Sequence, residues 1–341
     1  MSDTITTTTD LHALPDPGDP RATAEAVMFE IRRVIVGQDA MLERVLVGLL
    51  SGGHLLLEGV PGLAKTLTIK TLADVLGGTF KRIQFTPDLM PSDLVGTRIY
   101  RPDQGSFDVE QGPVFANFLL ADEINRAPAK VQSALLEVMQ EHQVTIGGET
   151  HRVPEPFLVL ATQNPIESEG TYDLPEAQVD RFLFKLVLDY PAVEDEIAVV
   201  DRISANPPVA RRSLAIRDLL EHQRVAREVF ADRSVLAYAV SLVDATRHPA
   251  RHGLADLEPL IQFGAGPRAS LGLVQAARAL ALLRNRTHVA PHDVRDLAPD
   301  VLRHRLVLSY DALSAGVSAD DLLDRVLAEV TEPEADHVKR S

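Results

Sequence analysis

The sequence predicts an α/β fold in which a parallel sheet carries a phosphate-binding loop and a helical domain follows the sheet. Three observations support this prediction. An apolar run leads into a Gly-containing turn that ends in Lys65-Thr66 and continues as helix-forming sequence. Several apolar segments then alternate with helical patterns, as expected when helices cover both faces of a parallel sheet. Beyond Pro191 the pattern is helical up to about Ala328.

The first expected strand, 54–58, leads into the phosphate-binding loop. In P-loop NTPases, such a turn wraps backbone N–H groups around the polyphosphate, and the N-terminus of the next helix adds favourable potential. Lys65 is expected to reach the β and γ phosphates, and the Thr66 hydroxyl to bind Mg²⁺. Taken alone, the segment is also compatible with an ordinary structural turn. The loop residues expected at the nucleotide are Gly59, Val60, Pro61, Gly62, Leu63, Ala64, Lys65 and Thr66.

Ala64 departs from the usual loop pattern, G-x-x-x-x-G-K-[ST], which has glycine directly before the lysine. Glycine adopts a positive φ without steric cost, whereas alanine does not. The loop therefore either has a different local geometry or tolerates a small strain at Ala64.

A second apolar run, expected as strand 117–122, ends in Asp122-Glu123. Acids at the carboxyl end of a buried parallel strand lie at the edge where ligands bind. Asp122 is suited to Mg²⁺ coordination through water, because Mg²⁺ keeps several waters and takes few carboxylates. Glu123 is suited to activating the attacking water. The alternative interpretation is a strand followed by a helix-capping acid.

A third apolar run, expected as strand 156–162, is followed by Asn164-Pro165. From the end of this strand, Asn164 could orient water or contact the γ-phosphate. Asn-Pro is also a common turn signal. The two interpretations are compatible, because the turn and the amide occupy the same place.

The periodicity divides the chain into four parts. Further strands are expected at 81–85 and 182–188, and a helix with one apolar stripe is expected at 130–142. Two insertions, 96–114 and 141–156, interrupt the alternation, and the second contains a Gly-Gly hairpin signal. The expected parts are a disordered acidic tail (1–20), an α/β nucleotide-binding core (21–191), a helical lid (192–330) and a flexible tail (331–341).

Composition excludes several functional classes. The 341 residues include no cysteine, which excludes disulfides, thiol catalysis and thiolate metal sites. No apolar run is long enough to span a membrane and no signal sequence is evident, so we expect a cytoplasmic protein. The net charge of −15 disfavours nucleic-acid binding, which depends on neutralising phosphates.

Four motifs together resemble the MoxR branch of the AAA+ ATPases, in which alanine before the loop lysine is ordinary. The resemblance implies an AAA+ core followed by a lid domain, binding of ATP and Mg²⁺, and assembly into a ring, expected to be a hexamer. It further implies that Val36 and Gly37 lie against the adenine, although a plain helix start is an equally good interpretation there. Both insertions would project toward the pore of the ring. The motifs are Gly59–Thr66, Ala121–Pro128, Ala161–Pro165 and Leu174–Phe182.

Two arginines gain roles from this resemblance. Arg181 would be a finger that enters the neighbouring subunit's site, since a guanidinium is always charged and forks onto phosphate oxygens. The alternative is an intramolecular salt bridge to Asp180 or Glu176. Arg268 lies in the first turn of an expected helix, where the dipole disfavours cations. In the family, this arginine reaches the γ-phosphate from the lid. Arg126 is a further candidate at the subunit boundary.

The resemblance also implies a function. MoxR relatives are chaperone-like remodellers that assist maturation of, or metal insertion into, client proteins with von Willebrand factor A domains. Two alternatives remain at this point: an ATP-gated scaffold with slow turnover, and the ATPase subunit of a magnesium-chelatase-like complex.

Overall fold

A computed structural model describes residues 20–60, 62–103, 105–165, 171–205, 208–212 and 214–333. Pro61 and nearly all of the two predicted tails, 1–20 and 331–341, lie outside these residues. None of the helices within the described ranges combines the length and apolar character needed to span a lipid bilayer.

The central sheet has five parallel strands in the order β2-β5-β8-β1-β9. All five strands expected from the sequence are present, and their ends differ from the prediction by at most two residues. Because the strands are parallel, their carboxyl ends lie along one edge of the sheet and their amino ends along the other. The strands are β1 (Leu55–Glu58), β2 (Phe80–Gln84), β5 (Phe118–Asp122), β8 (Leu158–Gln163) and β9 (Phe184–Val187).

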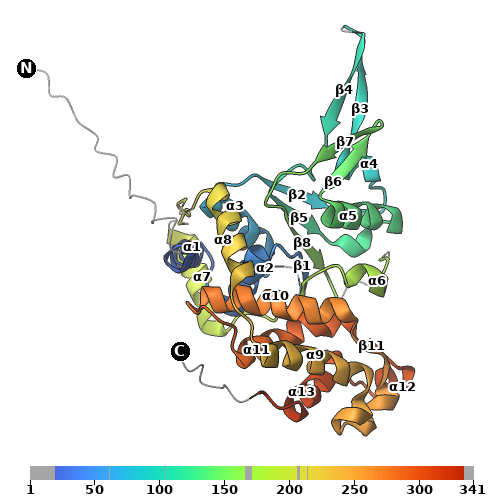
Figure 1. Ribbon diagram of the computed structural model, residues 1–341. Coiled ribbons are helices and arrows are strands. Elements are labelled where there is room, and N and C mark those ends of the chain that lie inside the picture. The colour runs from blue at the N-terminus through green and yellow to red at the C-terminus, as the bar shows by residue number, and fades with distance from the viewer. Residues whose placement is uncertain are drawn as a thin grey trace, which may run out of the picture.

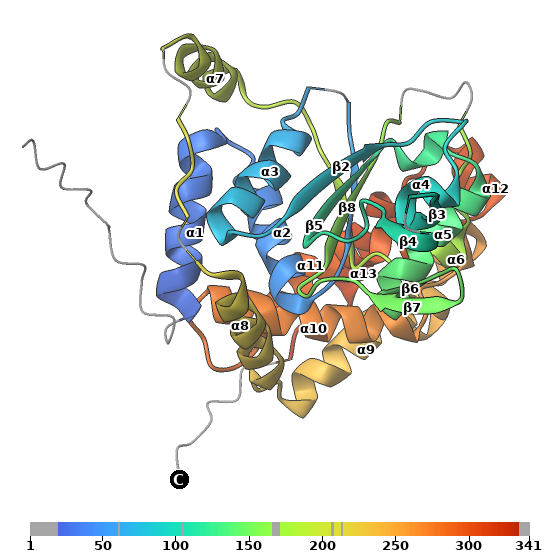
Figure 2. The ribbon, with the colours of Figure 1, turned by 90° about the horizontal axis from the view of Figure 1, so that it is seen from above.

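Helices cover both faces of this sheet (Figures 1 and 2). Successive strand residues point to opposite faces, so Leu120 packs in one hydrophobic cluster and Leu119 in the other. The second cluster includes the apolar stripe of α5, the helix expected at 130–142. The first-face helices are α1 (Pro20–Val34), α2 (Asp39–Ser51) and α3 (Lys65–Leu76), and α5 (Ala129–Glu141) lies on the second.

The two insertions form antiparallel hairpins. Strand β3 (Gly96–Arg101) pairs with β4 (Ser106–Gln111), and β6 (Gln143–Ile146) pairs with β7 (Glu149–Arg152). Both hairpins project from the same end of the molecule, away from the lid (Figure 1). The Arg98 guanidinium donates a 3.2 Å hydrogen bond to the carbonyl of Gly147, so the hairpins contact each other. Helix α4 (Pro91–Val95) leads into the first of them.

The lid shares the first hydrophobic cluster with the core. The side chain of Gln223 in α8 donates to the Leu49 carbonyl at 2.7 Å, and Gln275 in α10 donates to Ser51. Both bonds fix the lid to the end of α2. The α-helices after β9 are α7 (Val193–Ala205), α8 (Ile216–Glu228), α9 (Arg233–Arg247), α10 (Pro267–Leu283), α11 (Pro291–Leu302), α12 (Tyr310–Ser314) and α13 (Ala319–Glu329).

The prediction of helix throughout the region after Pro191 was wrong at two places. Strands β10 (Ile261–Phe263) and β11 (Val307–Leu308) pair antiparallel within the lid. Strands of three and two residues are too short to produce a readable alternation, and their pairing joins segments far apart in the sequence.

Candidate functional site

The phosphate-binding loop joins the carboxyl end of β1 to the N-terminus of α3. Lys65 is the first residue of α3, and its ammonium group donates a 2.7 Å hydrogen bond back across the loop to the Gly59 carbonyl. Burial lowers the pKa of Lys65, while the nearby carboxylates of Asp122 and Glu123 oppose this shift. A Cβ at Gly59 would lie 2.9 Å from the Leu188 carbonyl oxygen, so the loop needs glycine at this position.

Ala64 adopts the backbone conformation that glycine normally supplies. Its φ of 56° and ψ of 19° lie in the left-handed region, at the cap of α3. The loop therefore keeps the usual backbone geometry and tolerates local strain at Ala64, the second of the two possibilities that the sequence left open. This conformation costs an L-residue about 1–2 kcal/mol, which the surrounding structure offsets.

Asp122 and Glu123 end β5 beside Thr162 of β8. The Thr162 hydroxyl donates a 2.6 Å hydrogen bond to Asp122 Oδ1 and accepts one of 2.9 Å from the backbone N–H of Glu123. Thr162 is only 1% exposed. The sequence analysis did not predict a role for Thr162. In the structure, Ala121 pairs in register with Ala161, which places Thr162 directly opposite Asp122.

Two side chains of β2 also reach the acids, and sequence reasoning missed both. The Arg82 guanidinium lies 2.6 Å from Asp122 Oδ2. The Gln84 amide donates a 2.6 Å hydrogen bond to Glu123 Oε2, which also accepts one of 2.9 Å from Arg126. Arg126 therefore contacts the acid three residues before it. These bonds orient both carboxylates from the neighbouring strand and from the 3₁₀ turn η1 (Ile124–Arg126).

The carboxyl edge brings most of the predicted nucleotide-binding residues around one cavity of about 420 Å³. Asn164 lines it from the end of β8 and is 7% exposed. The ligand set fits Mg²⁺, since a carboxylate and a hydroxyl are hard oxygen donors and the cavity leaves room for phosphate and water. The predicted site residues that line the cavity are Gly59, Gly62, Leu63, Ala64, Lys65, Thr66, Asp122, Glu123 and Asn164.

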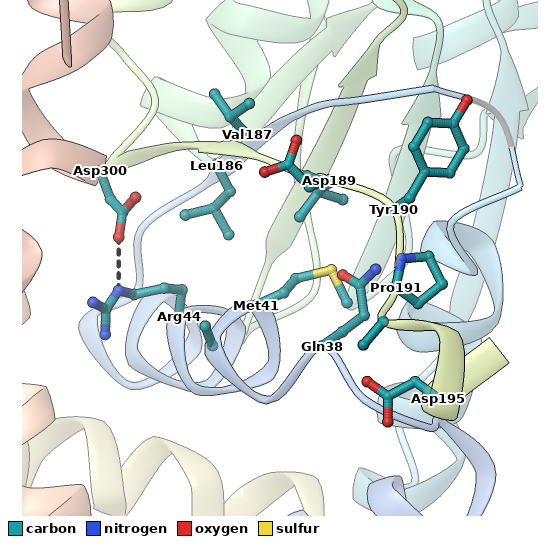
Figure 3. Close-up of a pocket in the computed structure, with 13 residues that line it drawn as sticks. Gln38, Met41, Arg44, Leu186, Val187, Asp189, Tyr190, Pro191, Asp195 and Asp300 are labelled. Carbon is teal, nitrogen blue, oxygen red and sulfur yellow. Dashed lines mark hydrogen bonds and ion pairs between the residues drawn. The ribbon is translucent and has the colours of Figure 1, made fainter. Parts of the chain in front are cut away.

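A second pocket, of about 320 Å³, lies between α2 and the segment after β9 (Figure 3). Figure 3 shows Gln38, Met41 and Tyr190 around it. It adjoins the phosphate cavity, because Leu188 lines this pocket and contacts Gly59 of the loop. Val36 and Gly37, the residues expected at the adenine, lie immediately before the lining residue Gln38. Gly37 has a φ of 65°, and a Cβ there would meet Asp195 at 2.5 Å.

Arg181 and Arg268 lie at the opposite edge of the sheet from the loop. Both line a small cavity beside His54, which directly precedes β1. Strand β1 separates His54 from the loop by four residues, or about 13 Å at about 3.3 Å per residue. Neither arginine lines the phosphate cavity of its own chain.

The position of Arg268 corrects the expectation that this arginine reaches the γ-phosphate from its own lid. The start of α10 is fixed at the amino edge, since a Cβ at Gly272 would lie 3.2 Å from Leu183. There the Arg268 guanidinium pairs with Asp180 Oδ2 at 2.9 Å.

Arg181 does not form the alternative salt bridge considered above. Within the part of the chain that the structure describes, neither Asp180 nor Glu176 pairs with it, and the carboxylate of Asp180 is shared by Arg268 and Arg305.

His54, which lines the same small cavity as Arg181, is buried, and burial lowers its pKa to about 4. Its Nδ1 accepts a 3.1 Å hydrogen bond from the Val159 N–H, so its protonated Nε2 donates to the Met139 carbonyl.

Comparison with known proteins adds family information to this geometry. Residues 54–184 match the ATPase family associated with various cellular activities, and residues 255–326 match the AAA lid domain. The chain is 58% identical to Chaperone MoxR1 of Mycobacterium tuberculosis, over 93% of this chain and 84% of the relative. It is 31% identical to Protein MoxR of Methylorubrum extorquens, covering 93% and 98% of the two chains.

Two further comparisons bear on the fold and on the alternatives. A crystal structure of a candidate ATPase from Cytophaga hutchinsonii superimposes with a TM-score of 0.88 at 48% identity, over 92% of this chain and 96% of that chain. The magnesium-chelatase 38 kDa subunit of Chlorobaculum parvum is 26% identical over 87% of this chain and 96% of the relative.

Replacing Thr162 tests whether its hydroxyl holds the two acidic residues together. We expect Thr162→Val to lower the free energy of unfolding by about 1–3 kcal/mol. Valine has nearly the shape of threonine but no hydroxyl, so the partly buried Asp122 carboxylate and the backbone N–H of Glu123 each lose a hydrogen-bond partner. Thr162→Ser keeps the hydroxyl and is the matched control, with a smaller loss. Urea denaturation measures both variants, and an equal loss in the two would contradict the role of the hydroxyl.

Proposed function

Because the chain belongs to the MoxR family of AAA+ ATPases, we propose that it binds ATP with Mg²⁺, hydrolyses it in the cytoplasm, and uses the energy as a chaperone-like remodeller of a client protein. The observation that carries this proposal is the single cavity at the carboxyl edge. It gathers a lysine, two acids and an amide from three separate segments of the chain: Lys65, Asp122, Glu123 and Asn164.

Each of these residues has one role in the proposed reaction. Lys65 binds the β and γ phosphate oxygens, and backbone N–H groups of the loop bind the remaining charge. Asp122 and the Thr66 hydroxyl would hold Mg²⁺, which neutralises charge on the β and γ oxygens. Glu123 accepts a proton from the attacking water, and Asn164 orients that water or the γ-phosphate.

The adenine would occupy the pocket of Figure 3. This pocket meets the phosphate cavity at the contact between Gly59 and Leu188, so one nucleotide can extend through both. Gln38 lines this pocket, so Val36 and Gly37, which directly precede it, would lie close to the base. Val60 lines neither of the two pockets, and Pro61 lies outside the described residues, so their contacts with the nucleotide stay predictions from the sequence.

A complete site requires a second subunit in this proposal. Arg181 and Arg268 line a cavity at the amino edge, so a head-to-tail neighbour could place both guanidinium groups at the γ-phosphate of the next chain. Repetition of a head-to-tail contact closes a ring if the rotation permits it, and we propose a hexamer. Arg181 is the finger, and Arg268 acts with it from the same side.

The proposed client is a protein with a von Willebrand factor A domain, whose maturation or metal insertion the ring assists. The name of the mycobacterial relative, a chaperone, supports remodelling over a passive scaffold. The much lower identity to the magnesium-chelatase subunit argues against that alternative. The two hairpins are the proposed contact surface for the client.

Removing the loop lysine tests the assignment of the phosphate site. We expect Lys65→Ala to bind ATP at least about 10-fold more weakly, because charged hydrogen bonds to phosphate contribute about 1.5–3 kcal/mol each. Isothermal titration calorimetry with Mg²⁺ measures the affinity. Lys70→Ala, on the exposed side of α3, is the control and should bind normally. Undiminished affinity in Lys65→Ala would refute the assignment.

Replacing Glu123 separates binding from hydrolysis. We expect Glu123→Gln to bind ATP but to hydrolyse it about 10²–10⁴-fold more slowly, since an amide cannot accept the proton of the water. Glu137→Gln, exposed on α5, is the control. Phosphate release measures the rate, and turnover equal to that of the wild type would remove Glu123 from this role. Held with ATP, the variant should also retain its client in a pull-down.

Mixing subunits tests whether Arg181 acts on the neighbouring site. We expect Arg181→Ala alone to bind ATP and to lose about 10³-fold or more in turnover, as for other arginine fingers. Added Lys65→Ala subunits carry an intact Arg181 and should restore part of the activity. Restoration supports action between subunits. If the mixture stays inactive, Arg181 acts within its own chain or has no role in hydrolysis.

A further inference from the structure

Arg305 is a buried arginine that lies against the segment carrying Arg181. It ends the 3₁₀ turn η4 (Arg303–Arg305), which follows α11 in the lid, and its side chain is 3% exposed. An arginine so deeply buried needs partners for all five of its N–H donors. The structure supplies a partner for each of them from two segments of the chain.

The donors of Arg305 are divided between side chain and backbone. Its Nε donates to Asp180 Oδ1 at 2.7 Å. One terminal nitrogen donates to the carbonyls of Leu183, at 3.2 Å, and Val301. The other donates to the carbonyls of Asp180, at 3.1 Å, and Phe182, at 2.6 Å. Four of these five bonds reach the segment 180–183.

These bonds fix the backbone on both sides of Arg181. Residues 180 and 182 each have their carbonyl held by Arg305, and the Phe182 side chain is fully buried in the core. The His304 imidazole donates a further 3.0 Å hydrogen bond to the Phe182 carbonyl. Arg181 therefore projects from a backbone that is bonded to the lid and cannot shift independently of it.

The same arrangement reaches the second arginine of this edge. Asp180 accepts from Arg305 through Oδ1 and from Arg268 through Oδ2, at 2.7 and 2.9 Å. The carboxylate thus holds the Arg268 guanidinium beside Arg181. Without Arg305, Asp180 would lose its buried partner and both arginines would lose their shared support.

We propose that Arg305 is a positioning residue for ATP hydrolysis in the neighbouring subunit: it fixes Arg181 to the lid and, through Asp180, orients Arg268. This inference rests on the proposed action of Arg181 between subunits. Arg305 touches no part of its own phosphate cavity, so its loss should leave the nucleotide site of its own chain intact.

Lysine cannot replace arginine here. An ammonium group has three donors on a flexible stem, whereas the guanidinium presents five in a fixed plane. Arg305→Lys keeps the positive charge beside Asp180 but cannot bond all the carbonyls of residues 180, 182 and 183. It is therefore a milder change than removal of the side chain, and it tests geometry instead of charge.

The test is turnover of Arg305→Lys, alone and mixed with Lys65→Ala subunits. Alone, we expect turnover to fall by about 10²-fold, the effect of misplacing a reacting group by about 1 Å, with ATP affinity within about threefold of the wild type. In the mixture, Lys65→Ala subunits supply a correctly held Arg181 to the intact sites of Arg305→Lys subunits, and activity should return. A variant that failed to fold would not be rescued. Arg325→Lys, on an exposed arginine paired with Asp256 in the same lid, is the control and should match the wild type.

Two results would overturn the inference while leaving the proposed function in place. In both, the Arg181→Ala mixture is rescued by Lys65→Ala. In the first, Arg305→Lys turns over at the wild-type rate. In the second, Arg305→Lys loses turnover and added Lys65→Ala subunits do not restore it. If the Arg181→Ala mixture itself fails, the action between subunits is refuted, and the role of Arg305 is refuted with it.

Discussion

The parallel pairing of β5 with β8 is the constraint on which the candidate site depends. Its register puts Asp122 opposite Thr162, so one buried hydroxyl can bond both the Asp122 carboxylate and the Glu123 backbone. Glu123 then leaves the strand with a φ of 56°, a conformation that an L-residue adopts only when its surroundings enforce it. Ala64, the N-cap of α3 in the phosphate-binding loop, has the same φ. Local strain therefore occurs on both sides of the cavity where the phosphate would bind.

The two edges of the sheet carry different halves of the proposed chemistry. The carboxyl edge holds the loop, the acids and Asn164, and the amino edge holds Arg181 and Arg268. Strands of four to six residues keep these edges apart, and no movement of a side chain can bridge that distance. This separation is the physical reason for proposing a neighbouring subunit: a single chain presents a nucleotide cavity on one side and the guanidinium groups of Arg181 and Arg268 on the other.

The sequence was sufficient to predict features that depend on neighbours along the chain. Local periodicity predicted the five strands and the apolar stripe of α5, and the order of residues predicted polar side chains where the strands end. The structure confirmed these positions. Features that join distant segments were missed. Arg82 and Gln84 reach the acids only because β2 pairs with β5, and the pair β10–β11 joins two very short strands. Arg268 was expected at its own γ-phosphate from the family resemblance. The sequence predicted its helix but not the packing of that helix against Leu183.

The end of α11 and the turn η4 bring the lid into contact with both edges of the sheet, the carboxyl edge through Asp300 and the amino edge through Arg305. Asp300 lines the pocket of Figure 3 and accepts from Arg44 of α2 at 2.7 Å and from Arg303 at 2.5 Å. Arg303 lies two residues before Arg305 and donates to the Lys185 carbonyl at 2.6 Å. A short run of the lid therefore bonds a wall of the proposed adenine pocket and the backbone that carries the proposed finger. These bonds are partly buried, and Asp300 joins them: it accepts from Arg44 of the pocket wall through Oδ2 and from Arg303 of η4 through Oδ1.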